Sequence, residues 1–289
     1  MIKLIVDSAC DINSEITNNY DIEVIPLSIT IDGISYLDGI DIDTHTIYKH
    51  MRNGDVPKTS QVSFESVSKV IDKCISNNDD FIYLAFSSKL SGTYDFAKKI
   101  IDTYKEKYTE RKMEIVDSKG GAGGNGLIAM QAIKMIKRNL SFETIIKQIQ
   151  FMIDHIAYYF TITDLEWLSK GGRINKTLGT MGNALNIKPY LTVVDGKMIV
   201  SKVIHGSKKT IQTLIRDVKI GTEKFSNQII AISHADDLKT ALNVEQKIKE
   251  TIIGCKTTIF EISAVLAVHL GIGGVGVFFL KEKPEFYEM

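Results

Sequence analysis

Residues 81–118 read FIYLAFSSKLSGTYDFAKKIIDTYKEKYTERKMEIVDS and contain a complete strand, helix and strand pattern. The apolar run at 81–86 predicts a buried strand, and apolar residues at helical spacing predict a helix over 93–108. Residues 113–116 predict the next strand. A strand, a helix and a further strand in this order are typical of a parallel sheet covered by helices.

The same alternation continues on both sides of this unit. Short β-rich runs and helical patterns take turns, which predicts an N-terminal parallel three-layer α/β/α domain. The expected elements are strands at 2–6 and 22–31, helices at 64–76 and 127–138, an excursion at 33–42 with a turn, and a short helix with Asp11 as its N-cap.

The pattern changes after a helix that opens at Ser141 and continues to about residue 155. Beyond it we expect strands at 158–162, 190–194, 198–204, 228–233, 257–262 and 276–280, and helices at 208–218 and 238–251. The turn Asp195-Gly196-Lys197 predicts a hairpin, so the second sheet is expected to be mixed. We therefore predict two domains, 1–156 and 157–289, in an α/β protein.

Composition excludes several classes of function. A chain of 289 residues that is 44% hydrophobic can bury two cores. Its 35 basic residues balance 35 acidic ones, so there is no net field to attract nucleic acid or an anionic membrane surface. The three scattered cysteines and the absence of an export signal favour a reducing, cytoplasmic location.

Residues 262–280 carry no charged side chain over a length that raises the question of a membrane span. Four glycines and His269 interrupt this stretch, and β-branched residues surround them. We therefore interpret it as a buried strand, turn and strand, without stable membrane insertion.

Hydroxyl-bearing residues follow three of the predicted parallel strands. They are Asp7-Ser8, Ser87-Ser88 with Ser91-Gly92-Thr93, and Asp117-Ser118. Ligands bind at the carboxyl edge of such sheets, and free backbone N–H groups at helix N-termini favour an anion. A carboxylate would suit this rim, although each residue taken alone is equally typical of a local cap or turn.

Residues 121–126, GAGGNG, match the GxGxxG fingerprint of dinucleotide-binding sites, but they stand late in the domain and more helix follows. A tight turn or close packing explains these glycines better, as it does for the similar run at 271–276. The histidines show no metal-binding spacing, so no metal site is expected, and no catalytic triad or nucleophile elbow is present.

Two further residues stand out as candidates for a site. His269 lies alone in an apolar stretch, where its imidazole needs a partner. Arg173 follows Lys170-Gly171-Gly172, and these glycines allow a helix to stop and the arginine to point at a ligand. A buried core histidine and a surface arginine remain the simpler alternatives.

Taken together, these stretches resemble the DegV family of fatty-acid-binding proteins, which includes the binding subunits of bacterial fatty acid kinase. The stretches that carry the resemblance run in order along nearly the whole chain: Ile5-Val6-Asp7-Ser8, Asp38-Gly39-Ile40, Pro57-Lys58-Thr59-Ser60-Gln61, Leu90-Ser91-Gly92-Thr93-Tyr94, Val116-Asp117-Ser118, residues 165–174 and Asn186-Ile187-Lys188-Pro189.

The resemblance implies a carrier without catalytic activity or cofactor that binds one long-chain fatty acid. Thr59 and Ser91 would bond the carboxylate, and His269 and Arg173 would complete the polar end. Residues expected near the head group are Ser60, Gly92, Thr93, Ser8, Ser118 and Gly121. A separate ATP-dependent kinase would phosphorylate the presented carboxylate, and the acyl phosphate would enter phospholipid synthesis.

The chain departs from the family pattern at three places. Val62 stands where a proline commonly follows Thr-Ser-Gln, and glycines fill residues 120–126. His205 replaces a common arginine in a segment that, with Lys208, we associate with docking of the kinase. Two alternatives to a carrier therefore stay open: an enzyme with a phosphate-bearing cofactor at 121–126, and a regulator that binds lipid to change its partners.

Overall fold

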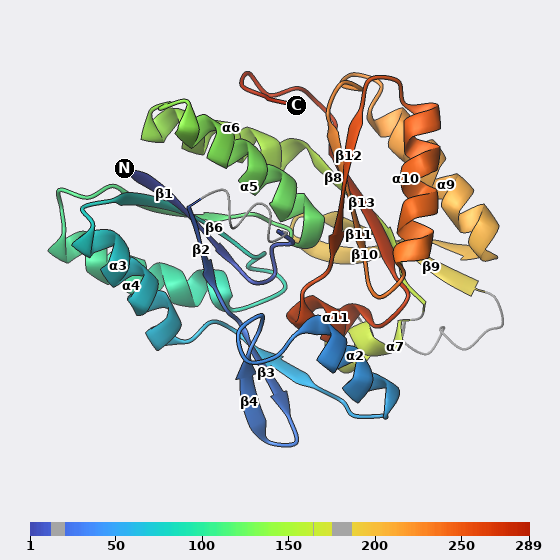
Figure 1. Ribbon diagram of the computed structural model, residues 1–289, viewed down its shortest axis with the longest axis horizontal. Coiled ribbons are helices and arrows are strands. Elements are labelled where there is room, and N and C mark those ends of the chain that lie inside the picture. The colour runs from blue at the N-terminus through green and yellow to red at the C-terminus, as the bar shows by residue number, and fades with distance from the viewer. Residues whose placement is uncertain (13–20, 164, 175–186) are drawn as a thin grey trace.

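The computed structural model describes residues 1–12, 21–163, 165–174 and 187–289. Two larger sheets stand side by side with helices between and outside them, and a small third sheet projects below (Figure 1). This is the two-domain α/β architecture that the sequence predicts, with one parallel and one mixed sheet.

The first sheet is parallel and has four strands in the order β2-β1-β6-β7. Its side chains alternate between two cores: Ile5 faces helices α3 and α4, whereas Leu4 and Val6 face α5 and α6. The elements are β1 (Ile2–Asp7), β2 (Ile22–Ile25), β6 (Asp80–Ala85), β7 (Met113–Asp117), α3 (Phe64–Ser76), α4 (Thr93–Lys107), α5 (Ala122–Lys137) and α6 (Phe142–His155).

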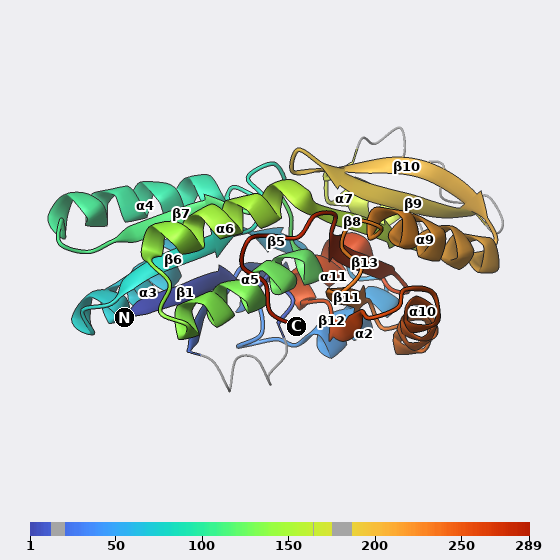
Figure 2. The same cartoon turned by 90° about the horizontal axis from the view of Figure 1, so that it is seen from above.

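The second sheet has six strands in the order β10-β9-β8-β13-β11-β12, and only β11 and β12 are parallel neighbours. Helices α9 and α10 cover its outer face. The elements are β8 (Ile156–Thr161), β9 (Ile187–Val194), β10 (Lys197–His205), β11 (Ile229–His234), β12 (Lys256–Glu261), β13 (Val275–Leu280), α9 (Ser207–Gly221) and α10 (Leu238–Thr251). Figure 2 shows the β9–β10 hairpin as a long ribbon along one edge.

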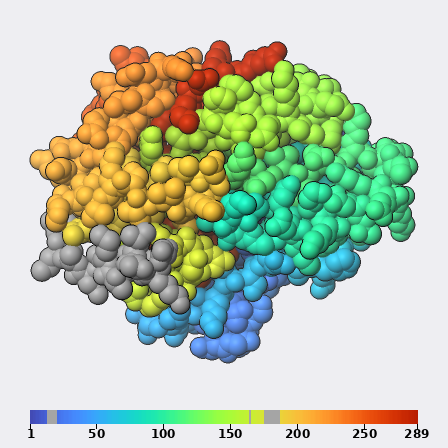
Figure 3. Space-filling model, turned by 180° about the vertical axis from the view of Figure 1, so that it is seen from behind, coloured from blue at the N-terminus to red at the C-terminus, as the bar shows by residue number. Residues whose placement is uncertain are grey.

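Helices α5 and α6 form a layer that both sheets share. One hydrophobic core contains Leu4 and Ile82 of the parallel sheet, α5 and α6, and Phe260 and Phe278 of the mixed sheet. On the far side the hairpin meets the parallel-sheet domain (Figure 3), where the Ser87 hydroxyl donates to the Gly196 carbonyl over 2.8 Å. The proposed boundary between residues 156 and 157 falls after the first residue of β8, which directly follows α6, and it stays a prediction.

The expected single strand at 22–31 is wrong. Pro26 lacks an N–H donor, and the chain leaves the parallel sheet at β2 and enters the small sheet as β3 (Ser28–Ile31). The small sheet is completed by β4 (Ile34–Leu37) and β5 (Lys58–Ser60). Between them lies α2 (Thr44–Arg52), which the sequence analysis missed and which Asp43 caps by accepting from the Thr46 N–H at 2.7 Å.

The expected strand, turn and strand at 262–280 is also wrong in its first half. Residues Ala264–Leu270 form helix α11, and only the last part, β13, is a strand. All residues from Ala264 to Val268 are buried, so the helix shows no polar face that would reveal its period. Within the described ranges, no helix combines the length and the apolar character that a membrane span requires.

Three smaller expectations concern the bounds of helices. Helix α5 begins at Ala122 and not near residue 127, so the glycines at 123–126 lie inside it. The predicted run before Arg173 is the short helix α7 (Glu166–Lys170). The helix expected after Asp11 falls on residues 13–20, which lie outside the described residues.

Candidate ligand-binding cavity

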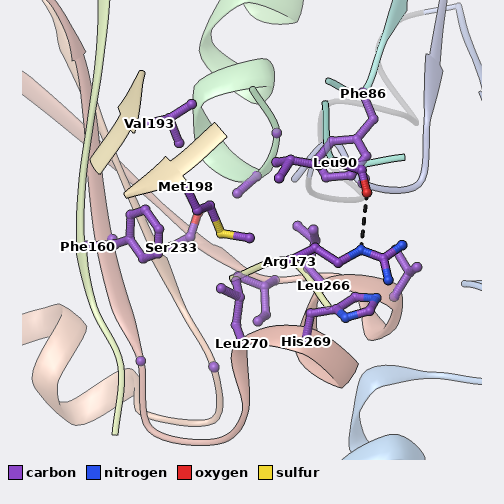
Figure 4. Close-up of a pocket in the computed structure, with 18 of the residues that line it drawn as sticks. Phe86, Leu90, Phe160, Arg173, Val193, Met198, Ser233, Leu266, His269 and Leu270 are labelled. Atoms are coloured by element: carbon purple, nitrogen blue, oxygen red, sulfur yellow. Dashed lines mark hydrogen bonds between the residues drawn. The ribbon is translucent and has the colours of Figure 1, made fainter. Parts of the chain in front are cut away.

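A cavity of about 270 Å³ lies where the two sheets and the small sheet meet. Its walls come from the loops after β1 and β6, from β5, from α11, and from strands β8, β10 and β13. Figure 4 shows apolar side chains of Phe160, Val193 and Met198 on one side of it, and Arg173 and His269 on the other. The cavity is thus mainly apolar with one polar end.

His269 forms the centre of the polar end. It comes from α11, and its Nε2 lies 2.6 Å from the Thr59 hydroxyl on β5. Its Nδ1 is buried and has no hydrogen-bond partner among the described residues. Burial, followed by the nearby Arg173 cation, lowers the pKa of His269 to about 4, so the imidazole is neutral at neutral pH.

Arg173 supplies a positive charge at the same end. Its Nε donates to the Leu90 carbonyl at 3.2 Å (Figure 4), and its Nη1 donates to the Gly171 carbonyl. Burial lowers the pKa of the guanidinium, which nevertheless keeps its proton near neutral pH. Arg173 and neutral His269 therefore leave one net positive charge, which an anion would complement.

Ser91 lies at the beginning of helix α4 and lines the cavity. Its hydroxyl accepts from the Thr93 N–H at 3.2 Å and shares a hydrogen bond with the Thr93 hydroxyl at 2.9 Å. A hydroxyl has one donor and two acceptor positions, so it can still exchange one of these bonds for a ligand. Thr93 itself is buried and supports Ser91 from outside the lining.

Glycines allow the polar groups to approach closely. A Cβ on Gly171 would lie 2.1 Å from His269 Nδ1, and one on Gly92 would lie 2.2 Å from Gln61 Oε1. A larger residue at Gly171 would push the imidazole away. Gly171 therefore allows His269 to approach closely, in addition to ending the helix as the sequence predicts.

The glycines of α5 are packed against protein atoms. A Cβ on Gly124 would lie 2.3 Å from the Tyr158 ring, and one on Gly126 would lie 2.3 Å from the Asp11 carbonyl. Gly121 approaches Phe86 in the same way at the cavity wall. This arrangement favours the close-packing interpretation of residues 121–126 over a phosphate-binding loop.

The structure brings seven of the ten expected head-group residues to the cavity wall: Thr59, Ser60, Ser91, Gly92, Gly121, Arg173 and His269. The other three stand apart. Ser8 accepts from the Leu27 N–H at 3.1 Å, and Ser118 bonds Gly120 and Asn125, so both hydroxyls serve local structure. His205 and Lys208 are exposed around the end of β10 and the start of α9, outside the cavity wall.

The sequence analysis missed most of the apolar wall and one polar group. Phe86, Phe160, Met198 and Leu266 line the cavity together with Tyr158, whose buried hydroxyl has no partner among the described residues. Phe160, Leu266 and Tyr158 are ordinary buried residues of their own strand or helix, whereas Phe86, which follows β6, and Met198 are partly buried. No local pattern distinguishes a side chain that faces a cavity from one that faces a filled core.

Three buried carboxyl groups, Asp7, Asp11 and Asp38, lie near the end of β1, and two of them contact the N-terminal end of α11. Asp38 accepts from the Val265 N–H at 3.3 Å, and Asp11 accepts from the Ser233 hydroxyl at 2.7 Å. Burial raises the pKa of Asp7 and of Asp11 to about 7, and that of Asp38 to about 6. Asp7 is the last residue of β1, Asp11 lies shortly after it and Asp38 follows β4, and none of the three lines the cavity.

The fold and the cavity define a class: a two-domain α/β protein that holds an apolar cavity with one cationic end between its sheets. The sequence model of the DegV family, described as an uncharacterised protein family, matches residues 1–282. The chain belongs to the DegV family.

Individual relatives agree with this assignment. A DegV domain-containing protein of Clostridium acetobutylicum is 32% identical over 286 residues, with 97% of this chain and 99% of the relative covered. A Thermotoga maritima protein whose structure is described as revealing a fatty acid binding function is 27% identical, with a TM-score of 0.82 over 96% of this chain and 99% of that one. The Streptococcus pneumoniae fatty acid kinase B3 protein, solved with linoleic acid, shares the fold at 22% identity and a TM-score of 0.88, covering 98% of this chain and 100% of that one.

Proposed function

We propose that this protein binds one long-chain fatty acid and presents its carboxylate to a separate ATP-dependent kinase, which forms the acyl phosphate for phospholipid synthesis. The carboxylate would lie between Thr59, Ser91, His269 and Arg173, with the tail along the apolar wall. The observation that supports the proposal most strongly is the mainly apolar cavity with the half-buried Arg173 cation at one end. The fatty acid function described for the Thermotoga maritima relative supports the ligand class.

Head and tail would contribute differently to binding. Each methylene buried against Phe160, Met198 and their neighbours contributes roughly 0.8 kcal/mol, so the tail supplies most of the affinity. A carboxylate buried without partners would instead lose several kcal/mol. The Arg173 charge and the nearby hydroxyls offset this loss and fix where the head group lies.

The protein would supply no catalytic group of its own. Its part is to hold the carboxylate at an accessible polar end, and the phosphoryl donor comes with the kinase. His205 and Lys208 are both exposed, and we place them in the docking surface for that kinase.

Native mass spectrometry of the freshly purified protein tests the ligand. We expect one co-purifying mass in the fatty acid range per chain. A bound nucleotide would instead support an enzyme with a phosphate-bearing cofactor and overturn the proposal. Addition of a fatty acid kinase and ATP then tests whether the protein presents the carboxylate to the kinase. If the lipid-loaded protein gives no acyl phosphate, the result would support a lipid-binding regulator.

A variant pair tests the head-group assignment. Ser91→Ala should weaken fatty acid binding about tenfold or more without unfolding the protein, since a hydrogen bond to a charged group contributes about 1.5–3 kcal/mol. Displacement of a fluorescent fatty acid measures the affinity. Ser88→Ala is the matched control, because this neighbouring hydroxyl donates to Asp117 Oδ2 at 2.5 Å and does not line the cavity. Equal affinities for both variants and the wild type would remove Ser91 from the site.

A further inference from the structure

Three side chains that commonly bind metal ions meet outside the cavity. His45 lies in the first turn of α2, Asp236 follows β11, and Glu261 is the last residue of β12. One ligand atom from each lies within 4.8 Å of the other two. Across the described parts of the chain, this is the one group of three or more such residues at that spacing.

Two buried polar groups lie behind these three residues. Tyr48 is one turn after His45 on α2 and is fully buried, and its hydroxyl has no hydrogen-bond partner in the part of the chain that the structure describes. His234 is 8% exposed, is the register partner of Glu261 across β11 and β12, and its Nδ1 also lacks a partner among the described residues. Glu261 and Asp236 act electrostatically on both side chains. Buried polar atoms usually have a hydrogen-bond partner, so these two groups near the same carboxylates are available to bond a ligand there.

Among the described residues, Arg52 pairs with one carboxylate of the group and leaves the other without an ion pair. Asp236 forms an ion pair with Arg52 of α2, and the Arg52 guanidinium lies 6.0 Å from the Tyr48 ring centre. Asp237 is occupied as the N-cap of α10, where it accepts from the Thr240 N–H at 3.1 Å. Two carboxylates therefore face one arginine, which leaves an excess of negative charge beside the imidazole of His45.

We propose that His45, Asp236 and Glu261 bind a divalent transition metal ion of the zinc type, with water in the remaining coordination positions. One imidazole and two carboxylates suit Zn²⁺, whereas Mg²⁺ prefers oxygen ligands alone. Tetrahedral Zn²⁺ with bonds near 2.0–2.1 Å places its ligand atoms roughly 3.4 Å apart. The present atoms lie within 4.8 Å of one another, so a contraction of at most about 1.4 Å achieves this. The metal-bound waters would reach the Tyr48 hydroxyl and His234 Nδ1.

The ion would join segments that are far apart in the sequence, next to the cavity. Asp236 follows Ala235 and Glu261 precedes Ile262, and both of these neighbours line the cavity. The Thr44 hydroxyl, beside His45, donates to the Ile262 carbonyl at 3.2 Å. Helix α2 also lies against α11, which carries His269 (Figure 1). The ion would thus fasten α2 to the ends of β11 and β12, independently of what occupies the cavity.

Isothermal titration of the full-length protein with ZnCl₂ tests the proposal. We expect one Zn²⁺ site per chain in the wild type, with affinity lowered about tenfold or more in His45→Ala and in Glu261→Gln, because each removes a ligand. His50→Ala is the matched control: it removes another histidine of the same helix, whose Nδ1 pairs with Asp55 at 2.7 Å. Its affinity should stay within about twofold of the wild type.

The Arg52→Ala variant and MgCl₂ complete the test. Loss of the arginine frees Asp236, so Arg52→Ala should bind Zn²⁺ more tightly than the wild type, and MgCl₂ should give no comparable binding heat. The proposal is overturned if His45→Ala and Glu261→Gln bind Zn²⁺ as tightly as the wild type, if His50→Ala loses the site equally, or if the wild type binds no Zn²⁺.

Discussion

At the scale of single residues, the charge at the polar end of the cavity is divided unequally between Arg173 and His269. The two cations would repel each other if both were protonated, and His269 is the one that releases its proton, because its pKa lies near 4. The remaining neutral imidazole can exchange a hydrogen bond with Thr59 or with a ligand. One charge is enough to balance one carboxylate.

The depressed pKa of His269 predicts a pH effect on stability. The unfolded chain takes up a proton near pH 6.5 whereas the folded protein does so only near pH 4, so acidification favours unfolding within this window. Relative to His269→Gln, the lipid-free wild type should lose about 3 kcal/mol of unfolding free energy between pH 7 and pH 4. Urea unfolding of both proteins at several pH values measures this difference.

The comparison with His269→Gln is needed because other buried groups titrate in the opposite sense. The pKa values of Asp7, Asp11 and Asp38 are raised to about 7, 7 and 6, so these carboxyls stabilise the fold at low pH and lose that contribution as the pH rises through these values. They are present in both proteins and cancel in the difference. A constant difference from pH 7 to pH 4 would show that His269 is protonated as easily in the folded state as in the unfolded one.

At the scale of helices and strands, the local sequence predicts the elements whose two faces differ. Helices α3 and α10 have the bounds expected from their apolar spacing, and Ser141 caps α6 as expected. Helix α11 was missed because it is apolar on all sides, and the division of residues 22–31 was missed because Pro26 acts through sheet pairing. The structures of α11 and of residues 22–31 depend on the elements that surround them. The local sequence does not contain this information.

The glycines of α5 allow a test of close packing at the element scale. Gly126→Ala would place a Cβ 2.3 Å from the Asp11 backbone carbonyl, which cannot rotate away, so we expect a loss of about 1–3 kcal/mol in unfolding free energy. Gly123→Ala would meet the Ser233 hydroxyl at 2.6 Å and the Phe278 ring at 2.8 Å. These are side chains that can shift, so its loss should be smaller.

Urea unfolding of the two alanine variants measures these changes in unfolding free energy. Alanine is the better helix former by about 1 kcal/mol, so a helix with free space around residues 123–126 would be stabilised by both changes. Stabilisation in both variants would therefore contradict the packing of α5 against its neighbours. It would also return the phosphate-loop interpretation of residues 121–126 to consideration.

At the scale of the whole molecule, the cavity exists because the two sheets share a layer of helices and do not meet completely. Ser91 and Arg173 could be proposed from short motifs beside recognisable elements, whereas Thr59 was expected only from the resemblance to the DegV family. The apolar wall of the cavity was not predictable, because β8, β10, β13 and α11 come together only in the folded protein. The same shared core joins Leu4 of the first strand to Phe278 of the last.

This shared core predicts how the protein responds to loss of its ligand. A ligand present at about 100 times its Kd stabilises the folded state by about 2.7 kcal/mol, which corresponds to a rise in Tm of about 5–10 °C for a chain of this size. We therefore expect delipidated protein to melt about 5–10 °C lower than protein saturated with a long-chain fatty acid. Differential scanning calorimetry should show a single transition in both states, because residues of both halves line the cavity and one core crosses the proposed boundary.

The Ser91→Ala variant connects this whole-molecule response to the head group. At a fixed fatty acid concentration well above both Kd values, a tenfold weaker site lowers the stabilisation by about 1.4 kcal/mol, so the variant's rise in Tm should be smaller by about 3–6 °C. Its lipid-free Tm should match that of the lipid-free wild type, since Ser91 is only partly buried and its lost bonds are local. Two separate transitions, of which the fatty acid shifts only one, would mean that the halves unfold independently and that the cavity belongs to one of them.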